Sequence, residues 1–355
     1  MIVAGIMSGT SLDGVDVAIV EMPGGRLLEH RSLAYPASLR RRLLAVSNSD
    51  CHTREIARLH FELAGVYARA VARTVDLAGC HGQTIYHEGR RATLQIGDGS
   101  VLAARLEAPV VCDFRPADIA AGGEGAPLVP FVDYHYFRHA RRTRVALNIG
   151  GIANITILPA GARVDGVIAM DTGPGNMVMD ALAARAAGGR QRYDRDGRMA
   201  ARGHVNRALL DDLLRQPFYR RKPPKSAGRE EYGAAFVERL LSTGLPMEDL
   251  MATAAALTAA SIAGAVRRFA PAKVDEVIAS GGGVRNRHLM GQLAAFLPGV
   301  RVAVSNEFGL DAAAKEAIAF ALLAYETWRG RPSNVPGATG ARHAVVLGKI
   351  CPRPR

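Results

Sequence analysis

The chain has 355 residues, of which 48% are hydrophobic and 22% charged, a balance typical of globular proteins rather than of disordered tails or fibres. At roughly 150 residues per domain, this length predicts about two domains, each with enough apolar material for a buried core. The four cysteines are scattered and form no C-x-x-C pair. We therefore expect neither a zinc site nor a disulfide framework. The same cysteine pattern favours a cytoplasmic location.

The formal charge of +12 raises nucleic acid or an anionic membrane as partners. Nearly all basic residues are arginines, which favours a compositional bias. Residues 185–229 nevertheless carry 13 Lys and Arg against 4 Asp and Glu, and a small anionic ligand would account for that excess. Aromatic residues are scarce, and the long uncharged stretch at residues 251–266 falls short of the roughly 20 strongly apolar residues that span a bilayer. We expect no nucleic-acid and no membrane partner; a homodimer is left open.

The first half is predicted to open with a β-hairpin, because apolar runs at residues 2–7 and 15–20 flank a polar glycine turn. Apolar residues spaced by three to four over residues 54–75 predict a helix. Strands are then predicted at residues 75–80, 93–96 and 109–112, the first leading into His81-Gly82-Gln83-Thr84 and the last into Asp113-Phe114-Arg115.

The second half repeats this opening, with apolar runs at residues 144–149 and 154–158 on either side of Gly150-Gly151. Further predicted elements are a strand ending at Asp171, a helix opening near Asn176 as its N-cap, a strand, turn and helix at 274–286, a helix at 311–328 with Asp311 as N-cap, and a closing strand at 344–350. Alternating strands and helices indicate an α/β protein. The repeated hairpin predicts two related halves, residues 1–140 and 141–355, with a tail that can return to the first.

Five glycine-bearing turns follow apolar runs, and their chemistry favours phosphate. Glycine lacks Cβ, so backbone N–H groups can approach an anion closely, and ligands of α/β sheets bind at the carboxyl ends of strands. Any single glycine turn is more often only a connection between strands than a phosphate site. Five such turns together indicate phosphate binding more specifically than any one of them. Because neither G-x-x-x-x-G-K-[ST] nor a strand-to-helix G-x-G-x-x-G is present, phosphates would be held by hairpin turns from both halves.

Asp171 is the strongest catalytic candidate, because an apolar strand delivers it to the rigid turn Thr172-Gly173-Pro174-Gly175. A carboxylate beside phosphates can accept a proton from a hydroxyl or a water, and the alternative is an Asx-turn cap. Lys222 and Lys225 lie in a proline-rich loop that is either a solvated surface or a closure over an anion.

Together these motifs resemble the anhydro-N-acetylmuramic acid kinases, in order and over nearly the whole chain. The segments that carry the resemblance are 9–16, 80–84, 148–154, 171–176 and 280–286. That family belongs to the sugar kinase, actin and heat-shock ATPase superfamily. The resemblance therefore implies an α/β fold of two related lobes of the ribonuclease H-like type, with ATP bound in the cleft between them.

The resemblance also implies site residues. Asp171 falls on the family's catalytic base. ATP-binding positions are Gly9, Thr10, Ser11, Leu12, Asp13, Gly14, Val15, Asp16, Gly150, Gly151, Gly281, Gly282 and Gly283. Sugar-binding candidates are His81, Gln83, Thr84, Asp113 and Arg115, the last because a guanidinium suits a lactyl carboxylate. Met7 and Asn148 stand where the superfamily usually has Asp, so we expect Mg²⁺ to be held mainly through phosphates, with Asp13 as the candidate protein ligand.

The implied activity is that of an ATP-dependent kinase in peptidoglycan recycling. It would open the 1,6-anhydro ring of 1,6-anhydro-N-acetylmuramic acid hydrolytically and phosphorylate O6. Two alternatives stay open at this stage: another sugar kinase of the same superfamily, and a nucleotide-gated interaction protein of the actin or chaperone type.

Overall fold

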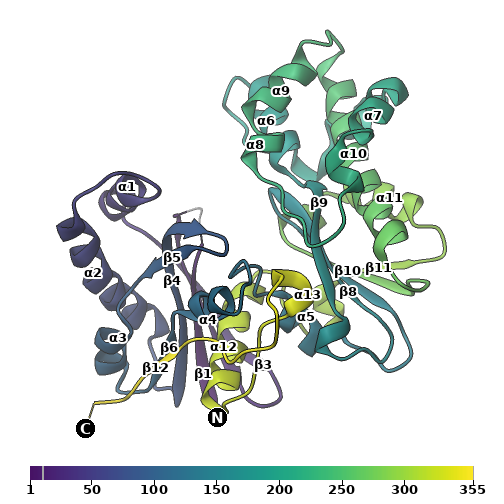
Figure 1. Cartoon of the computed structure of the whole chain (residues 1–355). Helices are drawn as coiled ribbons and strands as arrows, with labels where there is room; N and C mark the ends of the chain where they lie inside the picture. The colour runs from purple at the N-terminus through teal and green to yellow at the C-terminus, as the bar shows by residue number, and fades with distance from the viewer. Residues whose placement is uncertain (10–11, 355) are drawn as a thin grey trace. The chain divides into compact units, whose positions relative to one another are not determined.

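The computed structural model describes residues 1–9 and 12–354, and the chain divides into two compact units (Figure 1). Unit 1 combines Met1–Val132 with Gly309–Arg355, and unit 2 is Asp133–Phe308. We predicted halves of residues 1–140 and 141–355, with a tail that can return to the first. In the structure the whole segment from Gly309 onward packs with unit 1.

Unit 1 is a mixed β-sheet with helices on both faces. Its strands are β1 (Ile2–Ser8), β2 (Gly14–Glu21), β3 (Arg26–Ala34), β4 (Leu77–Glu88), β5 (Ala92–Ile96), β6 (Val110–Cys112) and β12 (Lys349–Cys351). Its helices are α1 (Ala37–Val46), α2 (Thr53–Val71), α3 (Gly99–Leu106), α4 (Phe114–Ala120), α12 (Lys315–Trp328) and α13 (Pro336–Thr339).

Unit 2 is also a mixed sheet covered by helices. Its strands are β7 (Arg144–Ile149), β8 (Ile152–Leu158), β9 (Ile168–Pro174), β10 (Glu276–Ser280) and β11 (Arg301–Val304). Its helices are α6 (Met177–Ala186), α7 (Arg207–Leu214), α8 (Arg229–Tyr232), α9 (Ala234–Leu241), α10 (Met247–Phe269) and α11 (Arg287–Phe296), with α5 (Pro130–Phe137) beginning just before the unit.

The two sheets share one strand arrangement. Their orders are β12-β6-β4-β1-β2-β3 and β11-β10-β7-β8-β9. In each, three successive strands form an antiparallel meander, and a later strand, β4 or β10, pairs parallel with the first strand of that meander. A further parallel strand, β6 or β11, lies outside it. This repetition confirms the predicted α/β architecture of two related halves.

The predicted strand at 75–80 is wrong at its end, because β4 continues through His81-Gly82-Gln83-Thr84 to Glu88. The antiparallel partner β5 extends it. Gly82, with φ of +74°, lies where the β1–β4 pairing shifts register between Ile6 and Ser8. The motif is therefore an irregular strand segment rather than a turn after a strand.

The long C-terminal helix begins later than predicted. Its first residue is Lys315, and Asp311 instead accepts a hydrogen bond from the Ala313 N–H (2.8 Å) within the preceding turn. The closing strand predicted at 344–350 is shorter and begins later: β12 covers Lys349–Cys351 and pairs antiparallel with β6 of unit 1.

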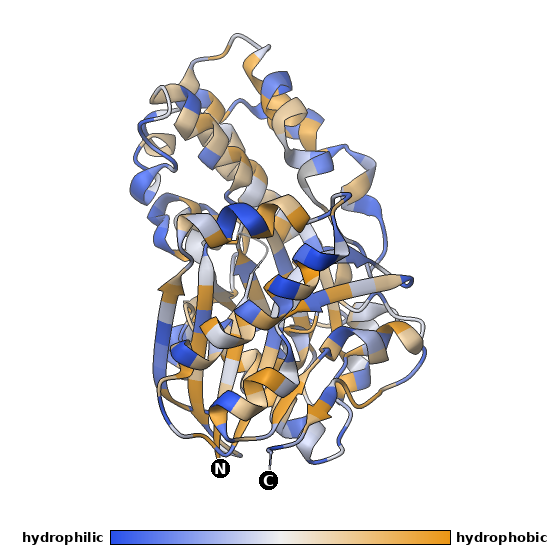
Figure 2. Ribbon diagram, turned by 90° about the vertical axis from the view of Figure 1, so that its left-hand side faces the viewer, coloured by the Kyte–Doolittle hydropathy of each residue, from blue (hydrophilic) through white to orange (hydrophobic). Residues whose placement is uncertain are grey.

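Apolar residues concentrate on the strands and on the helices packed against them (Figure 2). Helix α10 is long and apolar enough, by length and composition, to cross a membrane, but 89% of its apolar window is buried inside the structure. It belongs to the core of unit 2, where its residues pack with β7, β8 and α6.

Helix α12 lies directly against the sheet of unit 1 at two glycines. A Cβ on Gly5 would overlap the carbonyl oxygen of Ala317, and one on Gly79 would overlap that of Phe320. We predict that Gly5→Ala lowers the free energy of unfolding by about 3 kcal/mol, measured by urea denaturation. Gly291→Ala is the control: a Cβ there meets no atom within 4 Å, so this helical substitution is expected to be neutral or slightly stabilising. Equal stability of the two variants would contradict the close packing.

Candidate active site

The first glycine turn follows β1, and buried polar side chains form hydrogen bonds at its start. The Ser8 hydroxyl donates to Gln83 Oε1 (2.5 Å) and lies 2.6 Å from the Tyr35 hydroxyl. Gln83 Nε2 donates to the Gly9 carbonyl (3.1 Å). Thr10 and Ser11, two of the predicted ATP-binding residues, lie outside the described residues. Gln83 is fully buried, so it fixes the backbone at the start of the turn.

The remaining positions of this turn differ in what they can offer a ligand. The side chains of Leu12 and Val15 are buried in the core of unit 1, so only their backbone can reach a nucleotide. Asp13 is exposed, whereas Asp16 accepts a hydrogen bond from the Ser32 hydroxyl. Gly14 is required by the fold itself, since a Cβ there would overlap the carbonyl of Leu33 on β3.

Two of the predicted sugar-binding residues lie together. Arg115 Nη1 donates to the Gly125 carbonyl (2.8 Å), and Nη2 lies 2.8 Å from His81 Nε2. Because a guanidinium has only donors, His81 must accept through Nε2 and is neutral. Burial, and then the charge of Arg115, lower the pKa of His81 to about 3. The His81 ring also packs on Phe320, with centroids 4.7 Å apart.

This pair retains an unused donor. Arg115 Nε is buried and has no hydrogen-bond partner among the described residues. Buried polar atoms are nearly always paired in native proteins. Burial also lowers the pKa of Arg115 to about 10, yet it stays charged at neutral pH. A fixed cationic group with an unpaired N–H is what a carboxylate ligand requires.

The other sugar candidates have partners within the protein. Thr84 Oγ1 accepts from Gln95 Nε2 (3.2 Å). Asp113 accepts from Lys349 Nζ on β12 (3.0 Å). The structure therefore brings His81 and Arg115 together and gives Gln83, Thr84 and Asp113 contacts with other elements of unit 1.

Asp171 lies inside β9, which continues to Pro174 rather than ending at the aspartate as predicted. Its N–H donates to the Lys225 carbonyl (3.0 Å), and its Oδ2 accepts from the Ala227 N–H (2.8 Å). Burial raises the pKa of Asp171 to about 6; the Ala227 N–H opposes this shift and the charge of Glu231 adds to it. Oδ1 has no hydrogen-bond partner in the described parts of the chain, so this oxygen can accept a proton.

In the loop that holds Asp171, Lys222 is exposed and Lys225 is packed against its neighbours. Lys225 is only 8% exposed. Its Nζ donates to the Phe218 carbonyl (3.0 Å) and lies 4.5 Å from the centroid of the Phe218 ring. Glu231 Oε2 in turn accepts from the Gly228 N–H (2.8 Å). Of the two roles considered for Lys225, a solvated surface is wrong.

Three glycine turns of unit 2 are joined by backbone contacts. The N–H groups of Gly175 and Asn176 donate to the carbonyls of Gly151 (2.9 Å) and Gly150 (2.7 Å). Gly281, with φ of +84°, lies so close to Ile149 that a Cβ would be 2.7 Å from its carbonyl oxygen. Asn176 is the N-cap residue of α6, as predicted, but its side chain donates to that same carbonyl (3.2 Å) and makes no capping hydrogen bond to the helix. The turns form one rigid rim beside β9.

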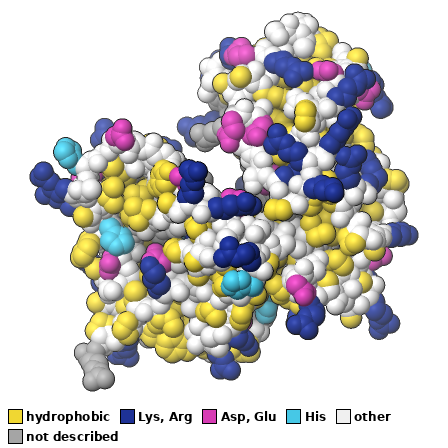
Figure 3. All heavy atoms as spheres, viewed as in Figure 1, with side chains coloured by type: hydrophobic (Ala, Val, Ile, Leu, Met, Phe, Trp, Pro, Cys, Tyr) yellow, Lys and Arg dark blue, Asp and Glu magenta, His cyan; other side chains and the backbone are white. Residues whose placement is uncertain are grey.

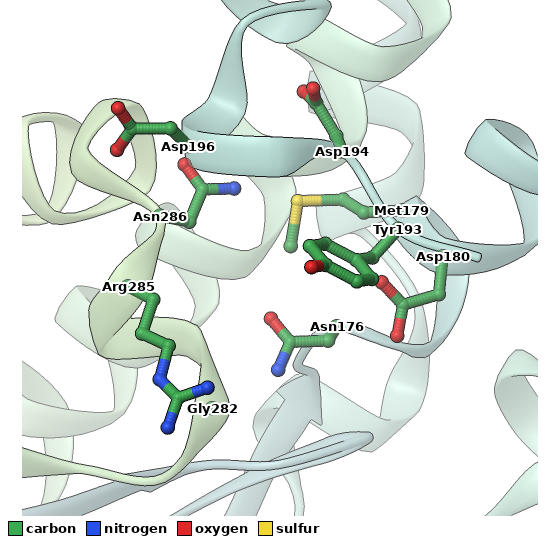
Figure 4. A pocket seen from close by; sticks show the side chains of 9 residues that line it. All are labelled: Asn176, Met179, Asp180, Tyr193, Asp194, Asp196, Gly282, Arg285 and Asn286. Atoms are coloured by element: carbon green, nitrogen blue, oxygen red, sulfur yellow. The ribbon is translucent and has the colours of Figure 1, made fainter. Parts of the chain in front are cut away.

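A pocket of about 240 Å³ opens next to this rim (Figure 4). It is lined by Asn176, Met179, Asp180, Tyr193, Asp194, Asp196, Gly282, Arg285 and Asn286. Burial raises the pKa of Asp180 to about 6. Sequence reasoning missed Asp180 and Tyr193; the available signal was helical spacing, since Asp180 lies four residues after Asn176, one turn along α6.

Basic side chains gather on the face of unit 2 seen in Figure 3. The basic segment 185–229 belongs to this unit and is exposed at most of its arginines. Among the described residues, no group of three or more His, Cys, Asp or Glu could hold a metal ion by itself.

Comparison with known proteins gives a consistent match over the whole chain. Residues 1–353 match the family described as anhydro-N-acetylmuramic acid kinase. The anhydro-N-acetylmuramic acid kinase of Salinibacter ruber is 44% identical over 98% of this chain and 95% of its own, and that of Caldanaerobacter subterraneus is 41% identical over 98% and 96%. Among solved structures, the activator of 2-hydroxyisocaproyl-CoA dehydratase from Clostridium difficile aligns over 93% of this chain and 96% of its own, with a TM-score of 0.47 and 12% identity.

Proposed function

This chain belongs to the anhydro-N-acetylmuramic acid kinase family, and on that premise we propose how its residues serve the reaction. The enzyme is a phosphotransferase that acts on an amino sugar. It takes ATP and water, opens the 1,6-anhydro ring of 1,6-anhydro-N-acetylmuramic acid, and releases N-acetylmuramic acid 6-phosphate and ADP in peptidoglycan recycling. We place this activity in the cytoplasm.

The observation that carries the proposal is the rim of glycine turns beside Asp171. Gly281 and Gly283 are glycines because the fold leaves no room for a Cβ against Ile149. At Gly150 and Gly151 the nearest atoms to a Cβ are 3.5 and 3.4 Å away, so the protein itself would accept a side chain there. A phosphate bound close to the backbone would leave no room for a side chain at these two positions. The absence of a Cβ there therefore supports a phosphate-binding role.

The nucleoside is proposed to occupy the pocket between α6 and the Gly281-Gly282-Gly283 turn. Arg285 lines that pocket and supplies positive charge beside the phosphates. Asp180 offers carboxylate oxygens to ribose hydroxyls or a base amine. The first turn, residues 9–16, is proposed to add backbone N–H groups to the phosphates.

Mg²⁺ fits the donor set of the first turn. This ion usually keeps several waters and takes one or two carboxylates in addition to substrate phosphates. Asp13 is exposed at the turn and is the residue that would hold the hydrated ion. When bound, the ion neutralises charge that develops on the transferred phosphoryl group.

Asp171 is proposed as the general base. Its Oδ1 accepts a proton from the water that attacks the anomeric carbon, while Oδ2 stays anchored on the Ala227 N–H. The bond from the anomeric carbon to the bridging oxygen breaks, and that oxygen, O6, attacks the γ-phosphoryl group in line. Arg115, held by His81 and Gly125, binds the lactyl carboxylate of the sugar.

The pH dependence follows from Asp171. A base with a pKa of about 6 is ionised at pH 7.5 and protonated well below pH 6, so kcat/KM falls as the pH drops through about 6. Glu231→Gln removes a negative charge that raises the pKa of Asp171 while keeping an acceptor for Gly228. We expect its acid limb to move about half a pH unit lower. Glu230→Gln, at the exposed neighbouring position, is the matched control and should leave the limb in place.

The function is tested by ADP release from ATP and Mg²⁺ with and without 1,6-anhydro-N-acetylmuramic acid. A sugar product heavier by one phosphate and one water would support coupled opening and transfer. If ADP were released only with a different sugar, the protein would be a sugar kinase of another specificity. If no sugar stimulated ADP release, the proposal would be refuted.

A further inference from the structure

Asp118 links segments of unit 1 that are far apart in the sequence. The side chain is fully buried. Its Oδ1 accepts hydrogen bonds from Thr339 Oγ1 (2.7 Å) and Asn334 Nδ2 (2.8 Å), and its Oδ2 accepts from the Gly125 N–H (2.8 Å). A buried carboxyl group that accepts from three donors fixes the positions of all three partners.

The loop that Asp118 holds is the one that positions Arg115. The Gly125 N–H donates to Asp118, and the Gly125 carbonyl accepts from Arg115 Nη1 (2.8 Å). The next bond runs from Arg115 Nη2 to His81 Nε2 (2.8 Å). One uninterrupted series of hydrogen bonds therefore leads from Thr339 in the C-terminal segment to Arg115, whose Nε–H is unpaired among the described residues.

Further contacts confine the same loop. The Glu124 N–H donates to the Thr339 carbonyl (2.8 Å), and the Arg342 N–H donates to the Ala121 carbonyl (2.9 Å). A Cβ on Gly123 would overlap the carboxylate of Asp118, and Gly125 has φ of +73°. The loop has little freedom to choose another path while the C-terminal segment is in place.

From this connection we infer that residues 334–339, acting through Asp118 and Gly125, are positioning residues for the binding of the sugar's carboxylate by Arg115. The inference rests on the proposed function. Two anchors, the Gly125 carbonyl and His81 Nε2, fix the plane of the guanidinium and leave its Nε–H unpaired. Loss of one anchor frees the guanidinium to rotate, and bidentate recognition of a carboxylate depends on that plane.

The test compares Thr339→Val with Thr339→Ser. Valine matches threonine in shape but removes the hydroxyl donor to Asp118, and serine keeps it. We expect Thr339→Val to raise the KM for 1,6-anhydro-N-acetylmuramic acid about tenfold, with kcat within about twofold and the KM for ATP unchanged, and Thr339→Ser to restore the KM. The KM for 1,6-anhydro-N-acetylglucosamine, which lacks the lactyl carboxylate, should not change.

Thr327→Val separates positioning from general destabilisation. Thr327 is also a buried threonine of unit 1, and its hydroxyl donates to the Leu347 carbonyl in the same C-terminal segment, but it does not contact Asp118. It should lower the midpoint of thermal unfolding comparably and leave the sugar KM unchanged. A tenfold rise in Thr327→Val, an equal rise for both sugars, or no rise in Thr339→Val would overturn the inference. Absence of turnover by the unmodified enzyme would refute the proposed function instead.

Discussion

Replacing Asp171 with Asn is expected to lower kcat by about 10³- to 10⁴-fold. The amide is nearly isosteric with the carboxylate and its oxygen can still accept from the Ala227 N–H, so the local structure is kept. An amide has no appreciable basicity, however, and cannot take a proton from water. Turnover is measured by ADP release, and binding of a non-hydrolysable ATP analogue by calorimetry should be unchanged.

Asp180→Asn is the informative comparison for that variant. Asp180 is the other carboxyl group of unit 2 whose pKa burial raises to about 6, but it lines the pocket beside the Gly281-Gly282-Gly283 turn. We expect this variant to weaken nucleotide binding and to retain most of kcat at saturating ATP. If Asp171→Asn kept more than a tenth of the original kcat, the assignment of the base would be wrong.

The second large effect is expected for Arg115→Lys. An ammonium keeps the charge but loses the planar fork, and it cannot bond His81 and Gly125 while also presenting two N–H groups to a carboxylate. We predict a loss of about a hundredfold in kcat/KM for the lactyl sugar, equivalent to ~3 kcal/mol. For 1,6-anhydro-N-acetylglucosamine the loss should be much smaller, since that sugar has no carboxylate.

The control for this substitution is Arg91→Lys, an exposed arginine after β4 that pairs with Glu88 (2.9 Å). Exposed ion pairs contribute little to stability, so both sugars should be turned over as by the unmodified protein. Equal losses for the two sugars in Arg115→Lys would mean that the guanidinium supports the fold rather than the carboxylate.

Local patterns were sufficient for most of the fold. The hairpins β1–β2 and β7–β8 and the helix α2 follow from runs and spacings of apolar residues within about twenty positions. The errors at the ends of elements come from contacts that apolar spacing does not record: β5 pairs with β4 from Gln83 to Glu88, and Asp311 accepts a hydrogen bond from the Ala313 N–H in a turn before α12 starts. The packing of α12 and β12 on unit 1 has no local signal.

The site shows the same division. The glycine turns and Asp171 could be predicted from the sequence, because neighbouring residues in the chain identify them. The burial of Lys225 depends on Phe218 and on Phe269, whose ring centroid is 5.2 Å from Lys225 Nζ. The role of Asp118 depends on its hydrogen bonds with Thr339 and Asn334. Such side-chain networks join residues separated by as many as 221 positions and follow no spacing rule.

The division of the chain into units also sets an order of assembly. Unit 2 is one continuous stretch, Asp133–Phe308, so it can fold as soon as that stretch has left the ribosome. The sheet of unit 1 lacks the cover of α12 and the edge strand β12 until residues 315–351 are made. Domains generally fold as units during synthesis, usually the N-terminal one first. Here Gly5 and Gly79 in the nascent N-terminal sheet stay uncovered until α12 has been synthesised. We expect chaperone binding to nascent chains to fall only after residue 328 emerges from the ribosome.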